Sequence, residues 1–186
     1  MILPNKSVEL SDTKKAVIAN SVATNAFPLS IGDAIQPAAT GHNQFVVPAA
    51  SSGLIVGIVV GLEFASKPAE VNSVVGVNTA STTAGANQIN THTDNETTGL
   101  WKVIYIPSHV PMEYKADVTP GTVGITDAAG FAFFNLLGAS LVAGLAGTLD
   151  GSAVVGLFGG TAGQFASYGV STESASKVVG YIYKGF

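Results

Sequence analysis

The sequence predicts an all-β protein: an antiparallel β-sandwich or barrel with long polar loops and an N-terminal arm. Short runs rich in Val, Ile and aromatic residues recur along the chain, and these side chains suit a pleated sheet. Clusters of Gly, Pro, Ser and Thr separate the runs about every ten residues, a spacing typical of all-β folds. The longest Val/Ile run contains two interior glycines, which disfavours a helix there.

The clearest strand is predicted over residues 100–106 (LWKVIYI), where Trp101 lies on one face with every second residue. Residues 54–64 (LIVGIVVGLEF) form another, in which Gly57 and Gly61 indicate bulges or close backbone approach. Further strands are expected at residues 27–35, 44–47, 112–118, 152–158 and 177–183.

Residues 1–25 differ in composition from the rest, with three of the eight Lys and no Gly. We expect them to form an arm, and residues 26–186 to form the β domain. Charged residues interrupt the N-terminal apolar stretch, so it does not read as a secretory signal. Residues 131–149 are apolar but lack flanking cationic anchors, and Asn135 and Ser140 interrupt them. We therefore expect buried strand and loop there, and no membrane partner.

Charged residues make up only 11% of the chain, where about 25% is usual for a soluble domain. The net charge of −4 and the absence of Arg leave no electrostatic footprint for nucleic acid. The absence of Cys excludes disulfides, thiolate catalysis and sulfur-ligated zinc. So few charges imply either that much of the surface consists of Thr, Ser, Asn and Gly, or that other protein covers much of it. We expect a homo-oligomer, with a trimer preferred over a dimer.

The sequence offers little catalytic chemistry. His92, Asp94 and Glu96 are the only clustered metal-ligand types, and on a strand they would share one face and could bind a cation. Thr and Asn interleave them, however, so a polar loop is the preferred interpretation and no metal or cofactor is expected. No nucleophile, phosphate or dinucleotide motif occurs. We expect no enzyme activity, although a hydrolase with a Ser–His–Asp triad assembled from distant residues stays an alternative.

Five motifs then follow one another along the chain: IGDAIQP (31–37), LIVGIVVGLEF (54–64), MEYKADV (112–118), TLDGSAV (148–154) and VVGYIYK (178–184). Their order resembles that of small virion structural proteins, the capsid decoration or cement proteins of short-tailed bacteriophages. The resemblance covers residues 27–183. Residues 65–70 are shorter and plainer than the corresponding part of that family.

The resemblance implies a decoration protein that binds the outer surface of the major capsid protein lattice and stabilises the head. The expected partners are the major capsid protein and further copies of this chain, and the expected location is the outer surface of the virion. Residues 1–25 are expected to help anchor the protein. The alternative is a carbohydrate-binding β-module of a tail fibre or spike. In that module Trp101 and the Thr-rich residues 79–98 would form the site, although a core position for Trp101 competes with this.

Overall fold

The computed structural model describes residues 1–19, 29–39, 45–51, 53–64, 101–119, 132–137, 147–154 and 163–183. It confirms the all-β class, because these residues form strands and one 3-10 turn. The first strands are β1 (Ile2–Pro4), β2 (Lys14–Ile18), β3 (Ala34–Pro37), β4 (Phe45–Pro48), β5 (Gly57–Phe64) and β6 (Trp101–Pro107). The later ones are β7 (Tyr114–Thr119), β8 (Ala132–Leu136), β9 (Thr148–Val154), β10 (Phe165–Val170) and β11 (Lys177–Ile182).

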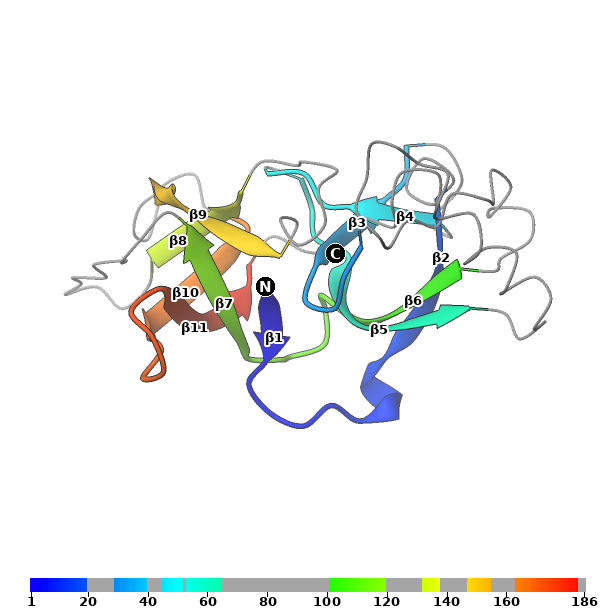
Figure 1. Cartoon of the computed structure of the whole chain (residues 1–186), viewed down its shortest axis with the longest axis horizontal. Coiled ribbons are helices and arrows are strands. Elements are labelled where there is room, and N and C mark those ends of the chain that lie inside the picture. Colours follow the sequence, from blue (N-terminus) through cyan, green and yellow to red (C-terminus); the bar gives the residue numbers. More distant parts are fainter. Residues whose placement is uncertain are drawn as a thin grey trace, which may run out of the picture.

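The strands form two units that lie side by side in Figure 1, with β1 between them. One unit, here called barrel 1, is a closed barrel in the order β2-β4-β3-β5-β6. The other is a sheet in the order β1-β7-β11-β10-β8-β9, in which β7 also pairs with β9. That last pairing closes β7, β11, β10, β8 and β9 into a second ring, here called barrel 2, and leaves β1 as an added strand.

The two barrels have the same connectivity. In each, the first strand pairs in parallel with the third: β2 with β4, and β7 with β9. The other pairs are antiparallel and follow the same order in both barrels. In barrel 1 they are β4–β3, β3–β5, β5–β6 and β6–β2. In barrel 2 they are β9–β8, β8–β10, β10–β11 and β11–β7. The expected barrel is therefore present twice, and each copy departs from a purely antiparallel order at one pairing.

The registers of the two barrels also agree. Ala16 pairs with Val103 in barrel 1 as Ala116 pairs with Val178 in barrel 2. Both fourth strands carry an irregularity just before a glycine, Gly61 in β5 and Gly169 in β10. The bulge predicted at Gly61 is thus confirmed. Following the ladders around both rings gives these equivalent inward positions: Ala16 and Ala116, Ile18 and Val118, Ile35 and Phe134, Val46 and Leu149, Val103 and Val178.

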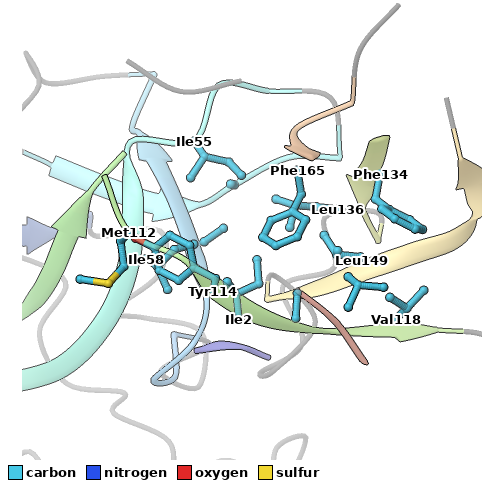
Figure 2. Packing of buried hydrophobic residues seen from close by; sticks show 14 of the residues in the cluster. Ile2, Ile55, Ile58, Met112, Tyr114, Val118, Phe134, Leu136, Leu149 and Phe165 are labelled. Atoms are coloured by element: carbon cyan, nitrogen blue, oxygen red, sulfur yellow. The ribbon is translucent and has the colours of Figure 1, made fainter. Parts of the chain in front are cut away.

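Each barrel buries the side chains at these inward positions. The core of barrel 1 consists of aliphatic residues, among them Ile18, Ile35 and Val59. The core of barrel 2 contains Phe134 and Phe165 and continues into the contact between the barrels. Figure 2 shows Tyr114 of barrel 2 beside Ile58 of barrel 1, so the two units share one apolar cluster.

Polar contacts also join the barrels. The side chain of Gln164 is fully buried; it accepts a hydrogen bond from Leu136 N in barrel 2 (2.8 Å) and donates to Ala50 O (2.8 Å) and Gly53 O (2.6 Å) next to barrel 1. Buried polar groups are costly unless they are paired. This amide therefore fixes the two barrels at this point.

The expected N-terminal arm is wrong for the described part of residues 1–25. Residues 2–4 form β1 on the edge of β7, and residues 14–18 form β2, a wall of barrel 1. Several of their side chains are exposed, but the segment is built into the two sheets and does not stand apart. A deletion of residues 1–25 would open a barrel.

Other expected strands shift by a few residues. The strand expected at 152–158 is β9, which begins earlier, and β10 replaces part of what was expected to be a connection. Of the segment at 27–35, residues 27 and 28 lie outside the described part; the described residues 29–35 form a turn at Gly32 (φ +89°) followed by the start of β3, and no strand leads into the turn among them. No helix among the described residues is long and apolar enough to cross a membrane.

Candidate functional site

An apolar groove lies where the segment between β1 and β2 passes over barrel 1. It has a volume of about 510 Å³. Leu3, Val8 and Leu10 form one wall, and Ile31, Val60 and Ile104 form the other. Lys6 and Glu9 also line the groove. The groove is therefore mostly apolar and carries one positive and one negative side chain.

A single 3-10 turn, Leu10–Asp12, shapes the first wall. The Thr13 hydroxyl and the Thr13 N–H both donate to Leu10 O, at 2.8 Å and 3.1 Å. These bonds close the turn, and Leu10 is 89% exposed on it. Contiguous apolar patches and grooves mark interaction surfaces, and Leu10 belongs to the apolar lining of this groove.

The bulge in β5 shapes the second wall. Val59 pairs with Tyr105 and Gly61 with Ile104, so Val60 is the extra residue of the bulge. A bulge redirects a side chain and ends regular pairing. Val60 and Gly61 both line the groove beside Ile104.

A smaller cavity of about 200 Å³ lies at one mouth of barrel 1. Val46, Val56 and Tyr105 line it, with Lys14 and His109 at its polar side. Burial raises the pKa of the Tyr105 hydroxyl. The equivalent mouth of barrel 2 is filled, because Tyr114 takes the place of Lys14 and is fully buried.

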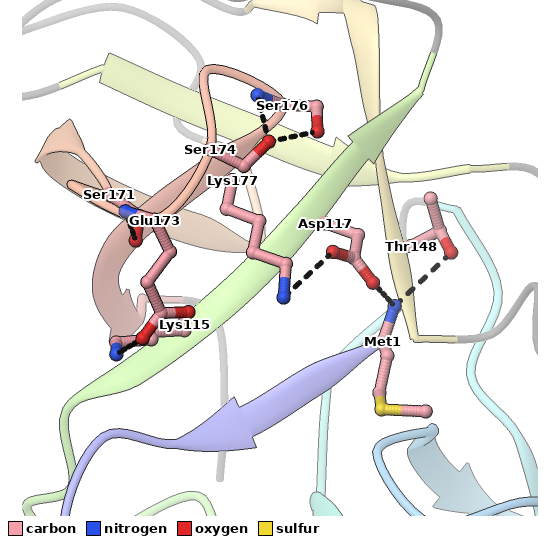
Figure 3. A network of polar contacts seen from close by, with 9 residues as sticks. All are labelled: Met1, Lys115, Asp117, Thr148, Ser171, Glu173, Ser174, Ser176 and Lys177. Carbon is pink, nitrogen blue, oxygen red and sulfur yellow. Dashed lines mark hydrogen bonds and ion pairs between the residues drawn. The ribbon is translucent and has the colours of Figure 1, made fainter.

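Polar contacts hold the N-terminal segment on barrel 2. In Figure 3 the Met1 ammonium donates to Asp117 Oδ2 (3.0 Å) and Thr148 Oγ1 (3.4 Å), and Lys177 lies 3.9 Å from Asp117. Lys115 pairs with Glu173 in the same view. These ion pairs are partly exposed and each adds little stability. The two bonds from the Met1 ammonium join the start of β1 to β7 and β9.

A second polar group ties the connection after β1 to barrel 2. Glu113 accepts hydrogen bonds from the Tyr168 hydroxyl and from the Asn5 amide. These bonds, that of Tyr168 first, lower the pKa of Glu113. In return, the bond to Glu113 raises the pKa of Tyr168 to about 12.

The residues named from the sequence do not build a site in the described structure. His92, Asp94, Glu96 and the tract 79–98 lie outside the described residues. The backbone of Trp101 begins β6 and pairs with that of Phe64. The structure describes the backbone of Trp101 but not its side chain. Within the described ranges, no three His, Asp or Glu side chains gather closely enough to hold a metal ion.

Sequence reasoning missed the groove. Its only local signal is Leu10, an isolated leucine between Glu9 and Ser11. The opposite wall comes from β5 and β6, far along the chain, and only the closure of the barrel brings it there. No family model, no curated protein and no solved structure matches this chain.

Proposed function

We propose that this protein is a phage capsid decoration protein that binds the outer surface of the major capsid protein lattice and stabilises the head. The observation that carries the proposal is the apolar groove between the 3-10 turn and the bulge of β5, with Leu10 exposed beside it. Such a surface suits burial against a neighbouring protein, since interface cores exclude charge and gather apolar side chains.

The composition supports the same proposal. A chain with 11% charged residues and 22 Gly presents few charges that association would have to desolvate. Repetition over a shell multiplies modest contacts, because many copies act on one particle. A protein that binds the assembled shell and not its free subunits stabilises the shell by mass action. Homo-oligomerisation, with a trimer preferred, belongs to this proposal.

Co-sedimentation with heads that lack this protein tests the proposal. Leu10→Ser removes the exposed leucine from the groove, and Leu54→Ser is the matched control, because Leu54 is 39% exposed, precedes β5 and lies outside the groove. We expect the native protein and L54S to bind and L10S to bind less, with unchanged melting temperatures. Equal binding of L10S would remove the groove from the interface, and failure of the native protein to bind would refute the function.

A carbohydrate-binding role in a tail fibre or spike is the second candidate, and one observation favours it. Three tyrosines on or after β10 and β11 are exposed: Tyr168 (43%), Tyr181 (42%) and Tyr183 (58%). The rings of Tyr168 and Tyr181 lie 6.0 Å apart. Such amphipathic rings suit recognition surfaces. A glycan array would decide: specific binding that Tyr181→Ala abolishes would favour this role.

A further inference from the structure

The two barrels differ at one edge of their first strand. In barrel 2, β1 lies antiparallel along β7, with Leu3 opposite Lys115. In barrel 1 the equivalent strand is β2, and Lys15 holds the place of Lys115. Among the described residues, no strand pairs with Lys15 on the corresponding side, because β4 joins β2 only from Val17 onward.

The backbone groups at this edge have a definite direction. Alternate residues of a strand direct their N–H and C=O to opposite sides. Ala19 N donates to Val46 O of β4 (3.0 Å), so Val17 and Lys15 also face that side, away from β6. The N–H and C=O of Lys15 therefore point to an edge that no described strand covers.

Barrel 2 shows how such an edge is filled. Asp117 N donates to Met1 O (3.0 Å), and Asn5 N donates to Glu113 O (2.8 Å). The paired Leu3 and Lys115 lie between these two bonds. In barrel 1 the N–H of Val17 corresponds to that of Asp117, and the C=O of Thr13 corresponds to that of Glu113. Lys15 lies between them, as Lys115 does in barrel 2. A segment as short as β1 would fit that edge in the same register.

The charges at the edge select the occupant. The side chains of Lys14 and Lys15 are both exposed. Lys15 forms an ion pair with Glu63 (2.6 Å), whereas no described carboxylate pairs with Lys14. Antiparallel pairing of two β2 edges would place these lysines against each other, and like charges across strands are destabilising. The chain's own β1 already occupies β7. The fitting occupant is therefore an extended segment of another protein that carries a carboxylate toward Lys14.

We infer that the free edge of β2 at Thr13 and Lys15 is a strand-addition site for an extended, acidic segment of the partner lattice protein. Strand addition supplies affinity through main-chain hydrogen bonds, while side chains give specificity. The identity of the partner rests on the proposed decoration function; the open edge does not.

Lys15→Pro tests the site. Proline removes the edge N–H and leaves the bonds of β2 to β6, because the N–H of Lys15 faces away from β6; proline is tolerated at such positions. Lys15→Thr is the matched control: it also loses the Glu63 ion pair but keeps the N–H. We expect K15P to bind heads about tenfold more weakly, the effect of about one or two lost hydrogen bonds. We expect K15T to bind nearly as the native protein does.

Hydrogen exchange of the native protein keeps the test independent of whether K15P folds. The Lys15 amide should exchange fast in the free protein and about tenfold more slowly on heads, since a newly formed bond must open first. The Lys115 amide, paired with β1, is the internal reference. Unchanged Lys15 exchange on heads, or equal binding of K15P, would overturn the strand-addition site while the decoration function stands.

If the native protein does not bind heads, the decoration function fails. The strand-addition site is then tested by hydrogen exchange of the Lys15 amide in the presence of a peptide. The probe is the capped peptide Ile-Glu-Val-Glu-Ile, compared with Ile-Lys-Val-Lys-Ile. Slower Lys15 exchange with the acidic peptide alone would support an acid-selective edge. No slowing with either peptide, or equal slowing with both, would refute it.

Discussion

Lys15 of β2 and Lys115 of β7 hold the same position in the two barrels, and each forms an ion pair with a glutamate, Glu63 and Glu173 respectively. The hydrogen bond from each lysine is the main cause that lowers the pKa of its glutamate. Both pairs are exposed, so they locate side chains more than they stabilise the fold. The two lysines differ in their backbone environment: β1 pairs with Lys115, while no described strand covers the edge at Lys15.

Replacement of Gln164 by alanine should loosen the contact between the barrels. The change leaves Leu136 N, Ala50 O and Gly53 O without their buried partner. Each unsatisfied buried group costs about 1–3 kcal/mol, so we expect a loss of roughly 3 kcal/mol or more in the free energy of unfolding. Denaturant unfolding followed by circular dichroism measures it. The control is Gln36→Ala, which removes only the bond from Ala50 N and should cost less; equal losses would contradict the bridging role.

Replacement of Tyr114 by phenylalanine should raise the melting temperature. The Tyr114 hydroxyl is buried and has no hydrogen-bond partner among the described residues, and burial raises its pKa. Removal of an unsatisfied buried hydroxyl recovers its desolvation cost, about 1 kcal/mol or more, while the ring keeps its packing. Differential scanning calorimetry measures the shift. A lower melting temperature would show that the hydroxyl has a partner.

Replacement by alanine should affect stability strongly at Gly180 of barrel 2 and weakly at Gly169 of the same barrel. A Cβ at Gly180 would lie 2.0 Å from Ala166 O on the neighbouring strand, whereas a Cβ at Gly169 would meet nothing within 4 Å. We expect Gly180→Ala to destabilise the fold by several kcal/mol, because backbone must move. Gly169→Ala should change stability by less than about 1 kcal/mol. Thermal melts measure the stability of both variants. Equal melting temperatures of G180A and G169A would contradict the close approach of Gly180 to Ala166 O.

The all-β class and several strands were predictable because their signals are local. The run that contains Trp101 alternates clearly and is bounded by Pro107, and the bulge at Gly61 was visible as a glycine inside a Val/Ile run. Strand 165–170 was missed because Ser167 and Gly169 dilute its apolar pattern, even though Ser167 is fully buried.

The duplication of the barrel was not predictable from the sequence. Equivalent positions share shape and burial more than identity: Ile35 corresponds to Phe134, and Val59 to Ser167, whose hydroxyl donates to Val179 O (3.0 Å). Connections of different length separate the equivalent strands, so no fixed period appears along the chain. Pairing partners identify the repeat, and pairing is a property of the folded chain.

The groove and the open edge were hidden for a related reason. Both depend on which strand lies beside β2 and β5, and that follows from closure of a barrel over long sequence distances. The charged and polar character of residues 9–15 reads locally as a solvated arm. Only the pairing of Lys14–Ile18 with β6 shows that the segment is a barrel wall.

Asp33 should make the protein less stable as the pH rises through the weakly acidic range. Its side chain is 1% exposed at the turn after Gly32. Burial raises its pKa from 3.8 to about 6, against the opposing effect of the hydrogen bond from Ser30 N (2.8 Å). The folded protein therefore binds this proton more tightly than the unfolded chain. The stabilisation is complete below about pH 4 and is lost as the pH passes 6, to a total of roughly 3 kcal/mol.

Replacement of Asp33 by asparagine tests this pH dependence, because the Asn oxygen can still accept the bond from Ser30 N while no charge is buried. We expect D33N to unfold at a higher denaturant concentration than the native protein at pH 7, and at a similar one at pH 4. The control Asp12→Asn removes the same charge from the 3-10 turn and should leave the decline between pH 4 and 6 in place. Asp33 is the only buried carboxylate among the described residues, and D33N lacks it. If the stability of D33N fell as steeply between pH 4 and 6 as that of the native protein, other groups would cause the pH dependence.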